Sequence, residues 1–240
     1  MPIIYEPRGR ALEYAPLAAN LYSGCTHGCT YCFAPAVLRT DRAGFHARAT
    51  ARQNVLVQLR RDAAKLKGDP REVLLCFITD PYQPAEKDLE ITREAIRILN
   101  DEGLAVTILT KGGLLAARDF DLLAYNPRNS LAVTLTTDDP SVSRQWEPAA
   151  APPQERMELL RQAHEAGIRT WVSFEPVFDP EACLRLLEST APYTDFYKVG
   201  KLNYHEAAKG IDWGEFRRQI QARLTTLGKS HYIKTDLAKA

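Results

Sequence analysis

The sequence predicts an α/β protein built as a partial (βα)6 TIM-type barrel of parallel strands. The fold class follows from apolar runs typical of buried strands, from amphipathic helical runs that alternate with them, and from a count of six such rounds in 240 residues. Six rounds are too few for a closed eight-stranded barrel, so the sheet should stay open at one side. The expected strands cover residues 18–23, 72–79, 105–110, 130–136, 169–174 and 196–199.

Amphipathic helices are expected after each of these strands. In the first of them, Val55, Leu59, Ala63 and Leu66 recur at helical spacing among arginines and lysines. A last short strand at 231–235 should complete a single domain over 1–240, with its core at about 17–228 and a closing segment at 229–240. The expected helices cover residues 51–67, 91–101, 114–124, 155–166, 180–188 and 213–227.

Composition and charge narrow the class of protein. With 45% hydrophobic and 25% charged residues, the chain has an ordinary globular composition. Lysine and arginine exceed the acidic residues by one, 31 against 30, so no global positive field recruits nucleic acid. The N-terminus lacks the features of a signal peptide, and no apolar run is long enough to span a bilayer. We therefore expect a cytoplasmic monomer without membrane contact, with its cysteines reduced.

A group of three cysteines suggests a metal site. Cys25, Cys29 and Cys32 have the spacing C-x3-C-x2-C, which lets one short loop turn three sulfurs toward a common point. Thiolates suit zinc or iron-sulfur chemistry, and structural zinc takes four protein ligands. No fourth ligand is evident, because Cys76 and Cys183 are isolated. A [4Fe-4S] cluster on three cysteines leaves one iron open to an external molecule, which suggests catalysis.

Polar residues follow the predicted strands, at the edge where a parallel barrel carries its active site. Alternation along the fourth strand places Thr134 and Thr136 on the face opposite Leu131, Val133 and Leu135, and this small polar face should point inward. Turn, cap and core roles are the alternatives for these residues. The five histidines show no metal spacing and are expected on surfaces or helix faces. The candidates are Thr79, Asp80, Lys111, Thr134, Thr136, Arg144, Ser173 and Glu175.

The cysteine spacing, with Tyr31 just before the last cysteine, resembles the radical S-adenosylmethionine (radical SAM) superfamily. The resemblance implies a (βα)6 core, a [4Fe-4S] cluster on the three loop cysteines, and reductive cleavage of SAM to a 5'-deoxyadenosyl radical that abstracts hydrogen from a substrate. Other fragments resemble the spore photoproduct lyase-like branch. They are Thr79-Asp-Pro-Tyr-Gln-Pro84, Leu109-Thr-Lys111, Glu147-Pro and Ser173-x-Glu-Pro-Val177.

The resemblance also implies SAM contacts. Tyr31 would pack near the adenine, and Thr79 and Asp80 would take the amino group. That assignment is by position, because the superfamily usually has a glycine-rich motif ending in Glu there. The SAM carboxylate would bind Lys111, with Arg144 as the competing ligand. The remaining ribose or methionine contacts would be Thr134, Thr136, Ser173 and Glu175.

The reaction itself is left open by the sequence. The lyase uses a hydrogen-donating cysteine at the position of Phe77, whereas Cys76 lies one residue earlier and should face the other side of the sheet. A donor role for Cys76 is one hypothesis, and a small buried core residue is the other. Lyase-type DNA repair and a non-catalytic iron-sulfur or zinc protein that binds nucleic acid are the alternatives to an enzyme with an unidentified substrate. The expected partner is a reductant such as flavodoxin or ferredoxin.

Overall fold

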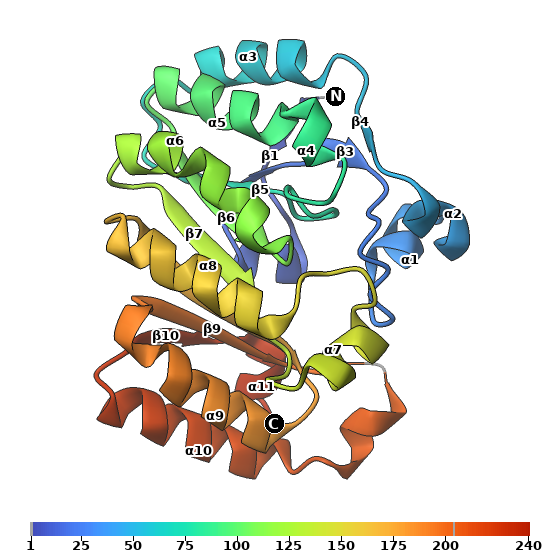
Figure 1. Cartoon of the computed structure of the whole chain (residues 1–240), viewed down its shortest axis with the longest axis vertical. Coiled ribbons are helices and arrows are strands. Elements are labelled where there is room, and N and C mark those ends of the chain that lie inside the picture. The colour runs from blue at the N-terminus through green and yellow to red at the C-terminus, as the bar shows by residue number, and fades with distance from the viewer. Residues whose placement is uncertain (1, 204) are drawn as a thin grey trace.

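A computed structural model describes residues 2–203 and 205–240. Within them, an eight-stranded sheet has the order β1-β2-β5-β6-β7-β8-β9-β10 (Figure 1). Among the described strands of this sheet, only β1 (Ile4–Tyr5) is antiparallel to its neighbour, and the other pairs are parallel. β1 and β10 (Ser230–Ile233) form two separate edges, so the barrel is open, which confirms the predicted fold class. The strands between them are β2 (Leu17–Ala19), β5 (Glu72–Leu75), β6 (Ala105–Thr110), β7 (Ser130–Thr134), β8 (Arg169–Val177) and β9 (Phe196–Lys201).

Three of the predicted strands are shorter than expected, and β7 ends at Thr134 instead of 136. The stretch 18–23 divides into β2 and β3 (Tyr22–Ser23), and β3 leaves the main sheet to pair with β4 (Thr50–Ala51). β5 ends before Phe77 because the Asn20 side chain takes the next amides. Its Oδ1 accepts from the Phe77 amide at 3.0 Å and from the Ile78 amide at 2.8 Å. A side chain thus replaces the neighbouring strand as the hydrogen-bond partner.

One row of helices covers the outer face of the sheet (Figure 1). They bury apolar stripes, as α5 does with Ala95, Ile96 and Leu99. The helix expected over 114–124 is instead a 3-10 helix followed by a short α-helix, and buried Asp119 marks the junction by accepting a hydrogen bond from the Tyr82 hydroxyl at 2.9 Å. The row consists of α3 (Val55–Lys65), α5 (Ile91–Asp101), η2 (Gly113–Asp119), α6 (Phe120–Tyr125), α8 (Pro153–Glu165), α9 (Pro180–Thr190) and α10 (Trp213–Thr226).

Short helices that periodicity did not predict occupy the loops. α1, α2 and α7 lie apart from the row of long helices in Figure 1. No described helix has both the length and the apolar character that a membrane crossing needs. The short helices are η1 (Gly9–Glu13), α1 (Ala34–Leu38), α2 (Arg42–Ala47), α4 (Glu86–Leu89), α7 (Pro140–Trp146), η3 (Ala191–Tyr193), η4 (Glu206–Gly210) and α11 (Thr235–Ala238).

The two faces of the sheet carry different residues. The large core between sheet and helices contains Leu131, Val133 and Leu135, as alternation along β7 predicted. A smaller cluster contains Ala18 and Leu74 from neighbouring strands, and lies on the inner face of the open barrel. Its partly buried members, which border the barrel interior, are Tyr5, Tyr14, Phe77 and Leu109.

Candidate active site

The cysteine loop begins directly after β3 and ends at α1. At its start, Gly24 has a φ of +80°, and a Cβ there would lie 2.0 Å from the Arg48 carbonyl oxygen. Only glycine fits this conformation at such a close backbone approach. Cys25 and Cys29 are buried, Cys32 is partly buried, and none of them is in a disulfide. The loop thus presents reduced thiols at the carboxyl edge of the strands.

The loop thiols are shielded from water. Burial, together with the charge of Asp80, raises the pKa of Cys25 to about 12. Burial raises the pKa of Cys29 to about 11, although the Lys111 ammonium opposes the change. The pKa of Cys32 is raised by burial as well. The metal-free loop therefore carries protonated thiols at neutral pH, and metal binding would release protons.

The donor set fits an iron-sulfur cluster. Cys32 packs against the small buried cluster that contains Cys25, and Cys29 acts electrostatically on Cys25 as Cys32 does on Cys29. Among the described residues, no three His, Cys, Asp or Glu side chains gather as ligands of a single metal ion. A four-iron cluster binds one thiolate on each of three irons, so its ligands need not meet at one point.

Among the described residues, three buried hydroxyl groups, on β8 or in the loops after β5 and β7, lack a hydrogen-bond partner. They belong to Thr79, Thr136 and Ser173, whose exposed fractions are 6%, 4% and 0%. A buried hydroxyl without a partner costs free energy, so such groups mark places where a polar ligand can bind. All three were predicted from the sequence as SAM contacts, and they are suited to hold a cofactor with several polar groups.

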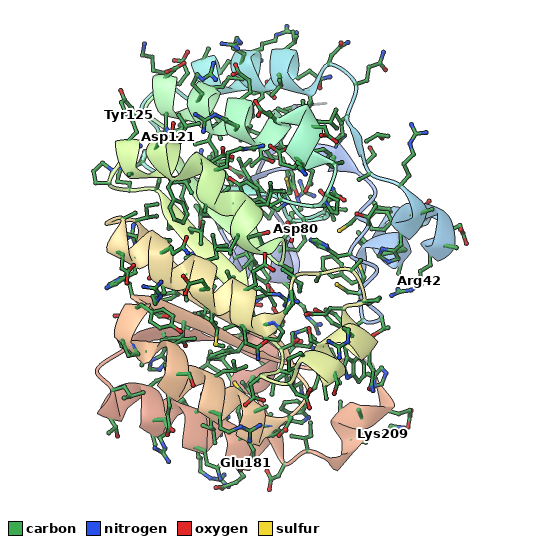
Figure 2. The ribbon with its side chains drawn as sticks, in the orientation of Figure 1. Arg42, Asp80, Asp121, Tyr125, Glu181 and Lys209 are labelled. Carbon is green, nitrogen blue, oxygen red and sulfur yellow. The ribbon has the colours of Figure 1, made fainter. Side chains whose placement is uncertain are left out.

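Asp80 connects the strand exits to the cysteine loop, near the centre of the molecule in Figure 2. Its Oδ1 accepts from the Thr110 hydroxyl at 2.7 Å and from the Tyr82 amide at 2.8 Å. Its Oδ2 accepts from the Lys111 amide at 2.7 Å and lies 3.3 Å from Nε2 of His27. Burial alone would raise the pKa of Asp80, but His27 and these hydrogen bonds lower it to about 2. The hydrogen-bonding positions of the Asp80 carboxylate are therefore already filled by protein groups.

Tyr31 is held by a buried charge network. Its hydroxyl donates to Oε1 of Glu147, and Oε2 of Glu147 lies 2.6 Å from Nη2 of Arg156, with both charged side chains fully buried. Lys111 adds a second cation, 5.7 Å above the Tyr31 ring. Burial and the Glu147 charge raise the pKa of Tyr31 far above its usual value. This network fixes the aromatic ring next to the cysteines.

Glu175 forms a second network on the inner face. Its Oε2 accepts hydrogen bonds from the Tyr14 hydroxyl and from Nζ of Lys234. The same ammonium lies 3.1 Å from the centre of the Tyr14 ring. The Glu175 side chain packs directly against Gly200, where an added Cβ would lie 2.7 Å from the Glu175 carboxyl group. The N-terminal and C-terminal segments thus both contribute side chains to the interior.

The remaining predicted residues differ in position. Thr134 is buried, and its backbone carbonyl accepts from Nη1 of Arg156 at 3.0 Å. Arg144 is exposed on α7, whereas Lys111 lies close enough to Cys29 to influence its thiol. The Lys111 charge therefore acts on the cysteine loop, whereas Arg144 is exposed to solvent, and the carboxylate role of either residue stays a prediction.

Cys76 and Phe77 face opposite sides of the sheet, as strand alternation predicted. Cys76 belongs to the large core under the helices, where its Sγ accepts from the Leu21 amide at 3.5 Å. Phe77 belongs to the inner cluster, and its ring centre lies 5.7 Å from that of Tyr14 and 5.4 Å from that of Phe33. Aromatic side chains therefore line the interior of the barrel beside Phe77.

The expectation of a surface or helix-face role for His27 was wrong. The side chain is 3% exposed and lies inside the loop, with Nδ1 3.1 Å from the Ala149 carbonyl oxygen. No sequence pattern indicated a role for Tyr14 or Lys234, because nothing in the sequence pairs residues 220 positions apart. The Glu147-Pro fragment could have indicated the buried carboxylate of this network, since a carboxylate next to proline after a short helix can end inside the core. Arg156 is a further functional residue, as the partner of Glu147. Its burial was not predicted, because it lies in a run that reads as an ordinary amphipathic helix.

Fold, loop and strand exits together define a radical SAM protein. Residues 19–182 match the radical SAM superfamily, and the chain belongs to it. This range includes the three loop cysteines and every strand exit as far as Glu175. The family implies a [4Fe-4S] cluster and SAM as cofactors.

The relatives found by sequence are described only as uncharacterized proteins. One from Mycobacterium tuberculosis is 34% identical over 178 residues, covering 71% of this chain and 52% of its own length. One from Methanocaldococcus jannaschii is 25% identical over 191 residues, covering 79% of this chain and 71% of its own. The chain thus spans about half the length of the mycobacterial relative.

Solved structures share the fold at low sequence identity. Spore photoproduct lyase complexed with dinucleoside spore photoproduct superposes with a TM-score of 0.73 at 12% identity, over 95% of this chain and 79% of the lyase. Streptococcus suis SuiB bound to S-adenosylmethionine gives 0.67 at 13% identity, over 90% of this chain and 49% of SuiB. These likenesses support the fold class and leave the substrate undefined.

Proposed function

We propose that the chain is a radical SAM enzyme in which Cys25, Cys29 and Cys32 hold the [4Fe-4S] cluster. The observation that carries this proposal is the set of three reduced thiols on one loop at the carboxyl edge, within the range that matches the superfamily. When bound, the cluster would supply the electron that cleaves SAM reductively to methionine and a 5'-deoxyadenosyl radical. The protein contributes binding, orientation and exclusion of water.

The strand exits support SAM binding in different ways. We assign the unpartnered hydroxyls of Thr79, Thr136 and Ser173 to polar atoms of SAM. Lys111 is assigned to the SAM carboxylate in preference to the exposed Arg144, because its ammonium is close to Cys29. Asp80, Tyr31 and Glu175 already have protein partners. Asp80 would position the loop and the Lys111 backbone, and Tyr31 would fix the ring beside the cysteines. Thr134 and Glu175 would line the space beyond them.

Anaerobic reconstitution tests this function. The chain is purified without oxygen, supplied with iron and sulfide, reduced with dithionite and mixed with SAM. We expect about four irons per chain and formation of 5'-deoxyadenosine, measured by mass spectrometry. Cys29→Ser should lose both signals while its circular dichroism spectrum stays that of the wild type. One bound zinc per chain with no 5'-deoxyadenosine would favour the non-catalytic alternative instead.

The substrate would bind on the inner aromatic wall of Tyr14, Phe33 and Phe77. This wall suits a substrate with a planar or apolar part, since aromatic rings stack on such groups. DNA photoproduct repair is the second candidate, and the fold shared with spore photoproduct lyase favours it. The residue at position 77 weighs against it, because phenylalanine has no hydrogen to donate to a carbon radical as a thiol does.

A dinucleotide assay distinguishes these substrates. Wild type and Cys76→Ala are incubated with dinucleoside spore photoproduct, SAM and dithionite. We expect no reversal of the photoproduct to thymidine by either protein while SAM cleavage is retained in both, because Cys76 lies in the helix-side core. Repair by the wild type that disappears in Cys76→Ala would instead make this cysteine the donor.

A further inference from the structure

Arg42, the first residue of α2, binds the backbone of the cysteine loop. Its Nη1 donates to the Cys32 carbonyl at 3.0 Å, and its Nη2 donates to the Thr30 carbonyl at 2.7 Å and to the Cys29 carbonyl. One guanidinium thus collects three carbonyl groups that lie within four consecutive residues. Figure 2 shows Arg42 beside α1 and α2, at the side of the molecule away from the long helices.

The same helix also holds the first cysteine. Nδ1 of His46 lies 2.8 Å from the Cys25 carbonyl oxygen, and the Phe45 carbonyl accepts from the Cys25 amide at 3.0 Å. Backbone contact is so close here that a Cβ on Gly24 would lie 2.9 Å from the Phe45 carbonyl oxygen. Each of the three cysteines is therefore tied through its own backbone to α2. None of these contacts involves the residues assigned to SAM.

Arg42 fixes the loop from one side while α7 fixes it from the other. In a trans peptide the carbonyl and the following amide point in opposite directions. With the Cys29 carbonyl turned toward Arg42, the Thr30 amide donates to the Trp146 carbonyl of α7 at 2.8 Å. Both polar groups of the peptide between Cys29 and Thr30 are satisfied, so its orientation is fixed between two helices.

The charge of Arg42 is directed at the loop. Across the residues that the structure describes, its guanidinium donates only to these backbone carbonyls. Arginine stays protonated at all relevant pH values, and a hydrogen bond from a charged donor is stronger than a neutral one. A cation next to a redox centre favours the reduced form, because reduction adds negative charge.

We infer that Arg42 is a positioning residue of the cysteine loop, which fixes the carbonyls of Cys29, Thr30 and Cys32 and raises the reduction potential of the cluster. The electrostatic part rests on the proposed function, since it needs a bound cluster. The positioning part concerns the chain alone. The contact between Arg42 and the loop lies outside the proposed SAM site. Through it the fold positions the loop for electron uptake by the cluster.

A redox titration monitored by electron paramagnetic resonance tests the electrostatic part. Reconstituted wild type is compared with Arg42→Gln, Arg42→Lys and Arg39→Gln, which removes one exposed charge at the end of neighbouring α1. At a fixed solution potential, Arg42→Gln should lower the ratio of reduced to oxidised cluster about tenfold relative to wild type. Arg42→Lys should lie close to wild type, and Arg39→Gln should equal it. Equal ratios in Arg42→Gln and Arg39→Gln would overturn the electrostatic role.

Hydrogen-deuterium exchange of the metal-free chain tests the positioning part without any cluster. Arg42→Gln should exchange the amides of residues 25–33 about tenfold faster than wild type, because each lost hydrogen bond to a charged donor loosens the loop. Arg39→Gln should match wild type, and the amides of β6 should be unchanged in every variant. Unchanged exchange at 25–33 in Arg42→Gln would overturn the positioning role. If the wild type fails to assemble a cluster but Arg42→Gln loosens the loop, the proposed function fails and the positioning role stands.

Discussion

Glu147 and Arg156 form an ion pair that water does not reach, with 2.6 Å between Oε2 and Nη2. Burial acts to raise the pKa of Glu147, yet the charges of Arg156 and Lys111 hold it below its usual value. Such a pair contributes little net stability compared with apolar residues, but breaking it leaves an uncompensated buried charge. Its purpose here is to hold Tyr31 against the cysteine loop.

Replacing Glu147 by glutamine should destabilise the fold strongly. The Arg156 charge would stay buried without a counterion, at a cost of about 3 kcal/mol in unfolding free energy. Urea unfolding at pH 7 measures this. The control is Glu158→Gln on the exposed part of the same helix as Arg156, where the partner Arg161 stays in water and little change is expected. Similar losses in both variants would show that burial of the pair does not determine its energetics.

For Lys198, burial outweighs the nearby charges in setting the pKa, whereas for Glu147 the nearby charges outweigh burial. Its Nζ lies 4.7 Å from the Trp171 ring centre and donates to the Tyr14 carbonyl, but no carboxylate is paired with it among the described residues. Burial therefore lowers the pKa of Lys198 to about 8. Because this folded-state pKa lies below that of the unfolded chain, the unfolded state binds more protons at this site between about pH 8 and pH 10.5. Stability from this group rises with pH across that window.

Lys198→Met should remove this pH dependence. Below pH 8 the variant should be more stable than the wild type by about 1 to 3 kcal/mol, and above about pH 10.5 the difference should vanish. Urea unfolding at several pH values between 7 and 11 measures both effects. Lys87→Met, at an exposed lysine of α4, is the matched control and should run parallel to the wild type. A variant curve that stays parallel to the wild type would refute a buried charge at this position.

Short helices and strands position the residues of the candidate site. The long ones were predicted correctly from hydrophobic periodicity: β6 and α5 have the predicted bounds of 105–110 and 91–101. The splitting of the first strand, the 3-10 helix at 113–119 and the helices α1, α2 and α7 did not follow from it. Elements of this length have too few residues for a repeat to show, and their position depends on partners such as Asn20 and Asp80.

Gly24 follows β3 directly and begins the cysteine loop against the Arg48 carbonyl. Gly24→Ala would combine a left-handed backbone, which costs about 1 kcal/mol, with a clash against the Arg48 carbonyl oxygen. We expect most of the bound iron to be lost after reconstitution, because the clash displaces the start of the cysteine loop. The control is Gly68→Ala, where φ is +72° but no atom lies within 4 Å of a Cβ. It should lose about 1 kcal/mol of stability and keep its iron.

At the scale of the whole molecule, the two termini complete the open barrel. Tyr14 comes from the segment before β2 and Lys234 from the segment after β10, and they meet at Glu175 of β8. The closing strand pairs in parallel with β9, and Leu237 of α11 is fully buried in the main core. The segment that the sequence marked only as a closing piece therefore supplies a side chain to the interior.

Deleting residues 229–240 should destabilise the molecule and open the edge of β9. Loss of buried Leu237 alone should cost about 3 kcal/mol, and an uncovered parallel edge favours aggregation. Thermal unfolding and light scattering measure the two effects. Deleting only 239–240 should change neither, since those residues are exposed. A stable, monodisperse product of the larger deletion would show that the closing segment is dispensable.

The fold class and the grouping of the three loop thiols can be read from the sequence. Helical and strand periodicity depend on neighbours within a few residues, and the cysteine spacing fits in one loop, so both can be read locally. Polar positions at or near the strand ends, such as Thr79, Thr136 and Ser173, can also be read from the sequence, because a parallel sheet brings its strand ends to one edge, and their contact with SAM stays a prediction.

Which charges meet depends on how the chain folds in three dimensions. Arg42 with three loop carbonyls, Glu147 with Arg156 and Tyr31, and Lys234 with Glu175 are contacts between segments that no local pattern links. Whether a charged residue is a solvated surface group or a buried partner depends on what the rest of the chain packs against it. The free energy of burying a charge is set by that environment, so its role emerges only when the chain has folded.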